Sequence, residues 1–383
     1  MSDPNITSIR IQDFALWDRM TQHGAPLSFE LEITARCMNN CRHCYVNLPA
    51  ARAEVKSKEL TREEIERIAG EAASMGAFWC LVTGGEPLLR EDFPETYLAL
   101  KRTGLMISVF TTAQLITEEH VRLFAKYPPR DLEITVYGST RKTYESITRL
   151  PGSFMAFRRG LNRLLGGGVK VRLKAMALRS NYQELPEIAR FCRKRTKDHF
   201  RFDPMLHLRS DGNPKRNEEI RSERLSSAEI VALEDSDAER SRALQQGCDE
   251  LIVPDLSHDA CNHLFHCGAG RGSFYVSYDG YFRLCSSLCH PECTYDLRKG
   301  SLADAWRNFV PRVRDMGSDR KEFLKSCRIC PIVNLCSWCP AHAHLETGEL
   351  DGAVPYFCEV AHARAAAIRR SAKQDACPRG VAL

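Results

Sequence analysis

The sequence lacks the segments that would direct a chain into a membrane or out of the cell. No apolar run approaches the ~20 residues that a transmembrane helix needs, and Met1 to Asp13 is polar, without the apolar stretch of a secretory signal. Low-complexity tracts are missing, as are internal repeats beyond an alternation of strands and helices. We therefore expect a cytoplasmic protein without a membrane span.

A strong excess of charge of one sign is missing too. The chain of 383 residues carries 54 Lys and Arg against 49 Asp and Glu, a net charge of +5. Its densest basic run, Cys192 to Lys197, is typical of a solvated helix end. Because nucleic-acid binding needs concentrated positive charge, we expect no nucleic-acid partner. The hydrophobic content of 43% supports a sizeable core in two or three compact units.

The first two-thirds of the chain predicts an α/β fold. Apolar and polar residues alternate over 27–33, the period of a strand. Two capping boxes, Thr61 with Glu64 and Ser226 with Glu229, predict helix starts, and Ser153 is a further expected cap. Helical stretches separate the strands, which predicts a parallel sheet. The five later strand candidates are 78–83, 106–111, 132–137, 169–177 and 200–204.

Cysteine is abundant, with 17 in the chain, and three of them directly follow the first strand. Cys37, Cys41 and Cys44 form a CxxxCxxC triplet, one thiolate short of full ligation of a [4Fe–4S] cluster. Three ligands would leave one iron open, and an open metal position is where chemistry happens. Chance structural cysteines, or part of a zinc site, are the competing interpretations of the triplet.

A second motif follows the second predicted strand, in the turn Thr83-Gly84-Gly85-Glu86-Pro87. Together with the triplet and Tyr45, this turn resembles the radical S-adenosylmethionine (radical SAM) superfamily. The resemblance implies a partial, open (β/α)6 barrel with its reactive site at the carboxyl ends of the strands. It also implies a SAM-binding [4Fe–4S] cluster on the triplet.

The same resemblance implies which residues contact SAM. The two glycines would let the backbone approach the ligand closely. A threonine at a strand end is otherwise just a good strand former, and Arg149 a surface charge. The contacts that the resemblance implies are Tyr45, Gly84, Gly85, Glu86, Thr112, Thr135 and Arg149.

Ten further cysteines lie between Cys261 and Cys358. In a reducing compartment they indicate metal rather than disulfides. Their spacing resembles the SPASM extension of radical SAM peptide-modifying enzymes, which holds two auxiliary iron–sulfur clusters. The resemblance assigns the first cluster to Cys261, Cys267, Cys285 and Cys339, and the second to Cys327, Cys330, Cys336 and Cys358.

Two features of this region leave alternatives open. Zinc ribbons separate their CxxC pairs by about 15–20 residues, whereas five residues lie between Cys330 and Cys336, which favours iron–sulfur. Cys289 and Cys293 exceed the eight ligands that two clusters need, and are either loop thiols or alternative ligands.

These features predict five segments. They are an N-terminal extension (1–26), a radical SAM partial barrel (27–208), a charged linker with a bridging helix (209–253), a small, loop-rich SPASM domain (254–360), and a C-terminal helix and tail (361–383). The extension is too short for a separate peptide-recognition domain, so a peptide substrate would dock directly or through a separate leader-binding protein.

The resemblance implies three [4Fe–4S] clusters, SAM, and an electron donor such as flavodoxin or ferredoxin. SAM would be cleaved reductively to a 5′-deoxyadenosyl radical, and auxiliary clusters suit net oxidation of a peptide or protein, such as crosslinking, thioether formation or dehydrogenation. Asp279 and Asp296 are possible bases or turn residues. The alternatives are a small-molecule substrate such as a tetrapyrrole side chain, a non-catalytic iron–sulfur electron carrier, and a zinc-dependent nucleic-acid binder.

Overall fold

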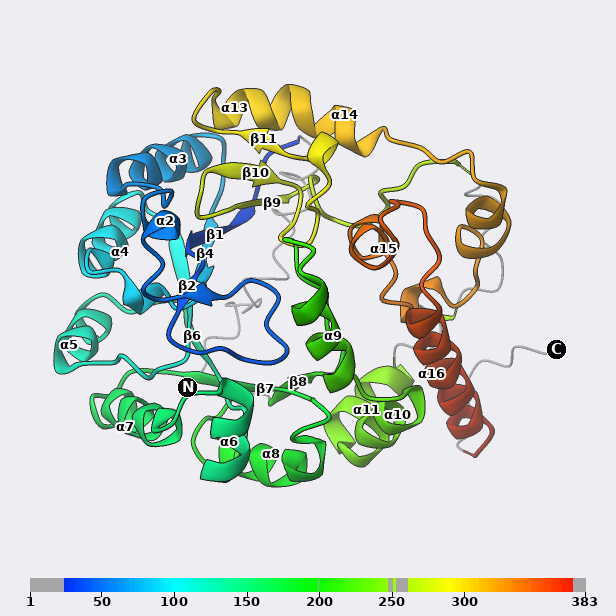
Figure 1. The fold of residues 1–383 in the computed structure, drawn as a ribbon, viewed down its shortest axis with the longest axis horizontal. Coiled ribbons are helices and arrows are strands. Elements are labelled where there is room, and N and C mark those ends of the chain that lie inside the picture. Colours follow the sequence, from blue (N-terminus) through cyan, green and yellow to red (C-terminus); the bar gives the residue numbers. More distant parts are fainter. Residues whose placement is uncertain (1–23, 199, 247–250, 253–260, 375–383) are drawn as a thin grey trace, which may run out of the picture.

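A nine-stranded, strongly curved sheet organises the molecule (Figure 1). The computed structural model describes residues 24–198, 200–246, 251–252 and 261–374. Strands follow one another in the order β11-β10-β9-β1-β4-β5-β6-β7-β8. The predicted α/β fold with a parallel sheet is confirmed.

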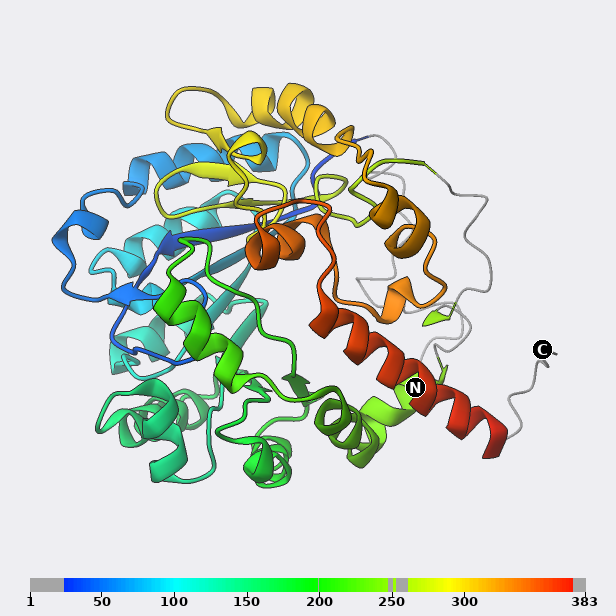
Figure 2. The same cartoon turned by 45° about the vertical axis from the view of Figure 1, so that its right-hand side comes forward.

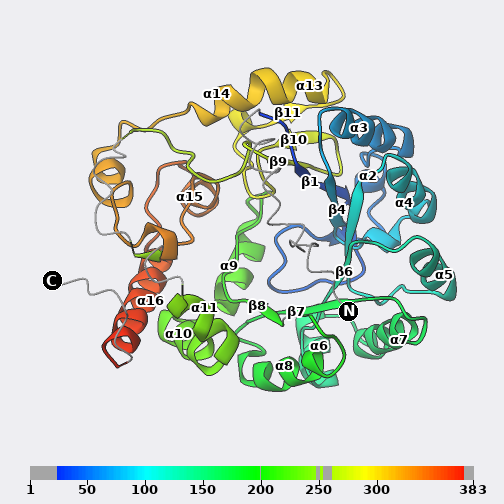
Figure 3. The same cartoon turned by 180° about the vertical axis from the view of Figure 1, so that it is seen from behind.

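The barrel half of the sheet contains all six predicted strands, paired in parallel. One face of each strand is apolar and packs under the helices, as Ile107 and Val109 do in the third of them. The helices form an arc outside the strands, seen from both sides in Figures 1 and 3. The strands are β1 (Ser28–Thr34), β4 (Trp79–Gly84), β5 (Met106–Thr111), β6 (Asp131–Thr135), β7 (Arg172–Met176) and β8 (Arg201–Asp203).

Two of the three predicted helix caps are present. Thr61 and Glu64 form a reciprocal capping box, and so do Ser226 and Glu229. The expected cap at Ser153 is wrong, because Gly152 precedes the helix and the buried Ser153 hydroxyl bonds to Thr148 instead. The helices of the barrel half are α2 (Ala53–Lys56), α3 (Arg62–Ser74), α4 (Phe93–Arg102), α5 (Glu118–Lys126), α6 (Arg141–Thr148), α7 (Ser153–Gly166) and α8 (Leu185–Arg193).

The cysteine-rich part of the chain adds strands to the same sheet. β9 (Ser273–Val276) pairs in parallel with β1, and the rings of Phe29 and Phe274 stack at a centroid distance of 5.1 Å. β10 (Tyr281–Arg283) and β11 (Tyr295–Asp296) continue outward in antiparallel pairing. The sequence did not reveal this extension, which joins the predicted barrel and SPASM segments in one sheet.

The predicted linker is helical and packed. Its helices are α9 (Pro214–Glu223), α10 (Ser227–Ser236) and α11 (Ala238–Gln246). Glu234 of α10 forms a buried ion pair with Arg364 of the terminal helix, at 2.8 and 3.0 Å. α9 lies between the barrel and the C-terminal helices (Figures 1 and 2). The predicted boundary at 254 lies outside the described residues.

The remaining helices belong to the C-terminal part. They are α13 (Leu302–Asp304), α14 (Val310–Arg314), α15 (Pro340–Thr347) and α16 (Pro355–Gln374). Ser301 caps the first of these through Asp304 N. The terminal helix begins ahead of the predicted 361, so Cys358 lies in its first turn. No helix in the described part of the chain has the length and apolarity to cross a membrane.

Candidate active site

The triplet lies in a closed loop at the carboxyl end of β1. The short strands β2 (Arg36–Cys37) and β3 (Leu48–Pro49) pair at the base of the loop. Asn40 N donates to the carbonyl of Thr148 at 2.9 Å, which ties the loop to the end of α6. Cys37 and Cys41 are buried and Cys44 is half-buried. The three thiols thus lie on one loop, at the end of the barrel where the sequence places them.

The Gly-Gly-Glu turn after β4 is joined to the segment that leads into Cys37. Gly85 N donates to Thr34 O at 2.7 Å, and Glu86 N donates to Arg36 O at 2.9 Å. A Cβ on Gly84 would lie 2.1 Å from Thr34 O, and one on Gly85 would lie 2.3 Å from Arg36 O. Glycine is therefore required by backbone packing against the end of β1, a reason that does not involve a ligand.

Glu86 is fully buried and anchors the turn to the end of β5. Its carboxylate accepts hydrogen bonds from Thr111 Oγ1 (2.7 Å), Leu88 N (3.2 Å), Thr112 N (2.8 Å) and Thr112 Oγ1 (2.6 Å). Burial raises the pKa of Glu86, and these donors oppose that rise. Because a carboxylate has about four acceptor positions, a SAM amino group would have to displace one of these donors.

The other predicted SAM contacts are spread around the same end of the barrel. Tyr45 is 40% exposed, with its ring edge-on to His207 at a centroid distance of 6.5 Å. Thr135 ends β6 and is half-buried. Arg149 ends α6 in the left-handed conformation (φ 53°) and pairs with Glu219 of α9 at 2.9 Å. Gly84, Gly85, Glu86 and Thr112 come together, whereas Arg149 already has a carboxylate partner.

The cysteine loop has the character of a binding site rather than of a packed core. Burial raises the pKa of the Cys41 thiol, and the neighbouring thiols of Cys44 and Cys37 raise it further. Among the described residues, both amide atoms of Asn39 and Nδ1 of His43 are buried without a hydrogen-bond partner. Clustered thiols with unpartnered polar atoms fit an iron–sulfur cluster and a polar ligand, which would supply the missing partners.

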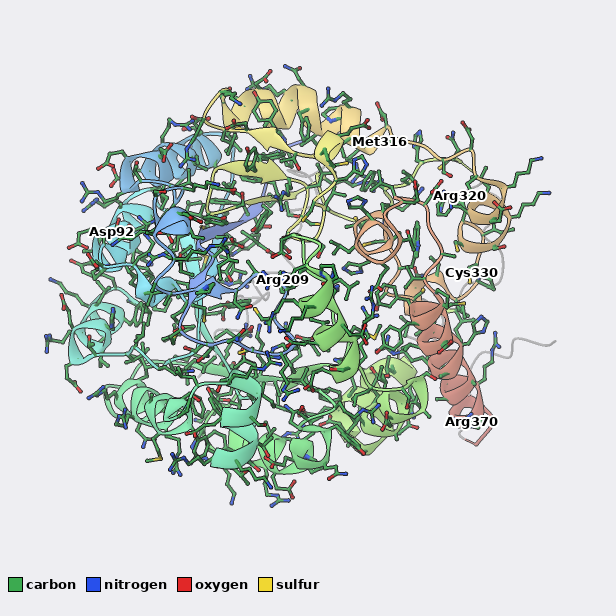
Figure 4. The ribbon with its side chains drawn as sticks, viewed as in Figure 1. Asp92, Arg209, Met316, Arg320, Cys330 and Arg370 are labelled. Atoms are coloured by element: carbon green, nitrogen blue, oxygen red, sulfur yellow. The ribbon has the colours of Figure 1, made fainter. Side chains whose placement is uncertain are left out.

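Four of the C-terminal cysteines gather beside the terminal helix. The pKa of Cys336 is raised to about 11 by burial and by the thiols of Cys358, Cys330 and Cys327. Tight turns hold this group, with Cys336 N donating to Val333 O at 3.0 Å. The structure brings these four cysteines together as the predicted second auxiliary set (Figure 4 labels Cys330).

Three cysteines of the predicted first auxiliary set gather closer to the sheet. The pKa of Cys285 is raised to about 12 by burial and by the neighbouring thiols of Cys339 and Cys267. Cys261 lies against Arg328, whose guanidinium donates to its sulfur at 3.5 Å and lowers its pKa. A cavity of about 110 Å³ is lined in part by Cys267 and Cys339 of this set and by Cys327 of the other.

The two surplus cysteines have other neighbours. Cys289 accepts a hydrogen bond from Arg283 Nη1 at 3.1 Å, and Cys293 is buried with its sulfur 3.7 Å from Met316 Sδ. Among the described residues, no group of three His, Cys, Asp or Glu side chains is arranged for a single metal ion. The thiolates of an iron–sulfur cluster each bind a different iron, so they lie further apart than the ligands of one ion. The absence of a single-ion site among these described residues therefore does not test the predicted cluster ligands, which stay a prediction.

The interior wall of the barrel carries charged residues that were not among the predicted site residues. Glu32 of β1 is buried and accepts a hydrogen bond from Tyr275 of β9 at 2.6 Å. Its pKa is raised to about 7, chiefly by burial. Two acids, Glu30 and Glu32, on the polar face of one strand were the available signal. Asp279, a predicted base, accepts from the hydroxyl of Ser277 in a turn.

Glu32 should make stability depend on pH. The pKa of Glu32 is about 7 in the folded protein and about 4.5 in the unfolded chain. Between these two pH values the folded protein keeps a proton that the unfolded chain has released, so stability falls as the pH rises. At pH 8 the buried, ionised carboxylate of Glu32 lowers the free energy of unfolding by about 3 kcal/mol. We expect Glu32→Gln to raise the thermal midpoint at pH 8 and to leave it nearly unchanged at pH 4.5. An equal shift at both pH values would contradict the assignment.

Comparisons with known proteins agree with this site. A family model described as "Radical SAM superfamily" matches residues 31–192. The AdoMet-dependent heme synthase of Methanosarcina barkeri is 24% identical over 349 residues, which cover 87% of this chain and 96% of that protein. The probable GTP 3′,8-cyclase of Methanococcus maripaludis is 25% identical over 306 residues, 78% of this chain and 93% of that protein.

Solved structures show the same fold over most of the chain. SuiB of Streptococcus suis bound to S-adenosylmethionine matches with a TM-score of 0.64 and 17% identity, covering 93% of this chain and 83% of SuiB. anSMEcpe with bound AdoMet and Cp18Cys peptide matches with a TM-score of 0.64 and 13% identity, covering 92% and 100%. The triplet and the Gly-Gly-Glu turn lie inside the matched family segment. Residues 31–192 form a radical SAM domain, which contains both motifs of the site.

Proposed function

We propose that this enzyme oxidatively modifies a peptide or protein, with SAM held at the cluster of Cys37, Cys41 and Cys44. When bound, a [4Fe–4S] cluster with one open iron supplies the electron that cleaves SAM to methionine and a 5′-deoxyadenosyl radical. The chain's own part is to hold the loop, to place SAM beside the Gly-Gly-Glu turn, and to exclude water. Thr112 and Thr135 are proposed to orient SAM from the neighbouring strand ends.

One observation carries the oxidative part of the proposal. Cys285 belongs to the group with Cys267 and Cys339, and it also lines a cavity of about 330 Å³ at the amino-terminal side of the barrel strands. Auxiliary clusters fully ligated by protein supply electron acceptors, and one held by Cys285 would border this cavity. An electron acceptor of this kind suits a reaction in which the substrate loses an electron after hydrogen abstraction, so we assign the eight cysteines to a SPASM pair of clusters.

The charges of this cavity favour a peptide. Its lining includes the acids Glu30, Asp131 and Glu133 and the cations Arg130 and Arg172. Asp131 pairs with Arg172 at 3.0 Å and Glu133 pairs with Lys174, so the lining carries both signs of charge, as suits a chain with mixed side chains. SuiB has been solved with its precursor peptide SuiA and anSMEcpe with the Cp18Cys peptide. A leader-binding protein and a flavodoxin or ferredoxin donor belong to this proposal.

A second candidate is oxidation of a tetrapyrrole side chain. It is favoured by the relationship to the Methanosarcina barkeri heme synthase, which spans nearly the whole of both chains. An iron porphyrin with propionate side chains tests it directly. Accelerated 5′-deoxyadenosine formation, with loss of mass from the added porphyrin, would favour this candidate over a peptide.

The auxiliary clusters can be separated from the catalytic one by single substitutions. We expect Cys285→Ala and Cys330→Ala each to lose up to about four of about twelve irons, while uncoupled SAM cleavage continues and substrate oxidation stops. Iron analysis and 5′-deoxyadenosine assays on anaerobically purified protein measure this.

Cys289→Ala is the matched control, because Cys289 is a thiol of the same region that lies with Arg283 rather than in either group. It should keep all its iron. Full iron content in both Cys285→Ala and Cys330→Ala would contradict the ligand assignment.

A further inference from the structure

The predicted linker reaches back to the cysteine loop through a buried arginine. Arg209, labelled in Figure 4, is 4% exposed. Its Nη1 donates to the carbonyls of Cys44 and Asn47, both at 3.2 Å, and to Asn47 Oδ1 at 3.1 Å. Its other edge binds the carboxylate of Asp211 at 2.6 to 3.1 Å. The guanidinium is therefore fixed in position with one side directed at the loop.

A second arginine reaches the loop from α9. Arg216 Nη2 donates to the carbonyl of Cys41 at 2.7 Å and to Asn47 Oδ1 at 3.4 Å. Its other nitrogen binds Glu219, which also pairs with Arg149 at the end of α6. Arg216 and Arg209 thus hold the backbone at Cys41 and at Cys44, from a segment far along the chain.

Asn47 links these contacts to the rest of the loop. Its Nδ2 donates to Asn39 O at 2.9 Å, and its backbone N–H points to Cys44 Sγ at 3.4 Å. Asn39 N in turn points to Cys37 Sγ at 3.4 Å. The two arginines, Asn47, the thiols of Cys37 and Cys44 and the carbonyl of Cys41 therefore belong to one connected hydrogen-bond network.

We propose that Arg209 and Arg216 are positioning residues of the catalytic cluster, which fix its loop and place positive charge beside its thiolates. The inference rests on the proposed role of the triplet. One-electron reduction makes a cluster more negative, and a nearby cation stabilises the reduced form more than the oxidised form. Arg216 would therefore ease the reduction that SAM cleavage requires.

A purely structural role is the alternative, and the reduction potential separates the two. A tie that only holds α9 against the loop can be replaced without changing the charge at the cluster. Arg216→Lys keeps the charge and loses the planar fork, whereas Arg216→Met loses both. Lys215→Met removes the same charge from the neighbouring, exposed position of α9, where solvent screens it, and is the matched control.

The experiment is a redox titration of the full-length, cluster-loaded protein followed by electron paramagnetic resonance. The catalytic cluster is identified as the signal that changes when SAM is added. We expect Arg216→Met to make its reduction about tenfold less favourable, a shift of about 59 mV to lower potential. Arg216→Lys should shift it less than half as much, and Lys215→Met should not shift it.

The outcomes distinguish this inference from the proposed function. Should Arg216→Met retain its iron and the SAM-responsive signal at an unchanged potential, the electrostatic role is overturned while the function stands. Loss of about four irons from Arg216→Met and from Arg216→Lys alike, but not from Lys215→Met, favours the purely structural tie and overturns the electrostatic role. A wild-type protein without any SAM-responsive signal overturns the proposed function itself.

Discussion

We expect the replacement of Cys37, Cys41 and Cys44 together with alanine to abolish SAM cleavage and to leave about eight of about twelve irons bound. The physical reason is that the three thiols lie on one loop at the end of β1, apart from the C-terminal cysteines that gather beside α15 and α16. Removing them takes away one site and leaves the other two. Iron and sulfide analysis, with 5′-deoxyadenosine formation under dithionite, measures both effects.

The control for this variant is Cys80→Ala. Cys80 is a buried thiol on β4, outside the loop and outside both C-terminal groups, so this change should keep about twelve irons and full SAM cleavage. Undiminished 5′-deoxyadenosine formation by the triple variant would refute the assignment of the triplet. Stoichiometric zinc in the wild-type protein would refute the iron–sulfur interpretation as a whole.

We expect Gly85→Val to lose the catalytic cluster as the triple cysteine variant does, but for a different reason. Its new Cβ would lie 2.3 Å from Arg36 O and 2.6 Å from Ala35 O, and backbone cannot rotate away as a flexible side chain can. The segment leading into Cys37 has to move, at a cost of about 3 kcal/mol or more. We expect a lower thermal midpoint together with loss of the catalytic cluster.

The matched control is Gly70→Ala on α3. A Cβ there meets nothing within 4 Å, so this helical substitution should stabilise the protein by about 1 kcal/mol. A Gly85→Val protein with full iron content and an unchanged midpoint would show that the strand ends adapt. Because the glycine is required by backbone packing, loss of SAM cleavage in this variant does not by itself show that Gly85 contacts SAM.

Local sequence patterns predicted most of the barrel. The six strands could be found because their apolar faces alternate with polar ones, and the two capping boxes could be found because four consecutive residues contain the whole motif. β9 could not be found in this way, since its pairing with β1 depends on residues far apart in the chain. The predicted cap at Ser153 was wrong because a serine that caps a helix and a serine with a buried hydroxyl cannot be told apart in the sequence.

The resemblance predicted much of the site, but not the residues that hold the cysteine loop in place. The triplet and the Gly-Gly-Glu turn were visible as short motifs. Arg209 and Arg216 read as surface charges of a linker, because only the fold brings them to the loop. Glu86 and Arg149 were expected to contact SAM, whereas each already binds partners within the protein. The cysteine grouping follows the predicted sets apart from Cys261, which lies with Arg328.

The place of β9 in the sheet has a consequence for how the chain folds during synthesis. β1 leaves the ribosome more than two hundred residues before β9, the strand that covers one of its edges. Until then that edge exposes unpaired backbone groups, a template for association with other chains. Such long-range pairing is also slow to form. The barrel strands therefore form an open sheet during synthesis, and its exposed edge at β1 is covered only when β9 pairs with it.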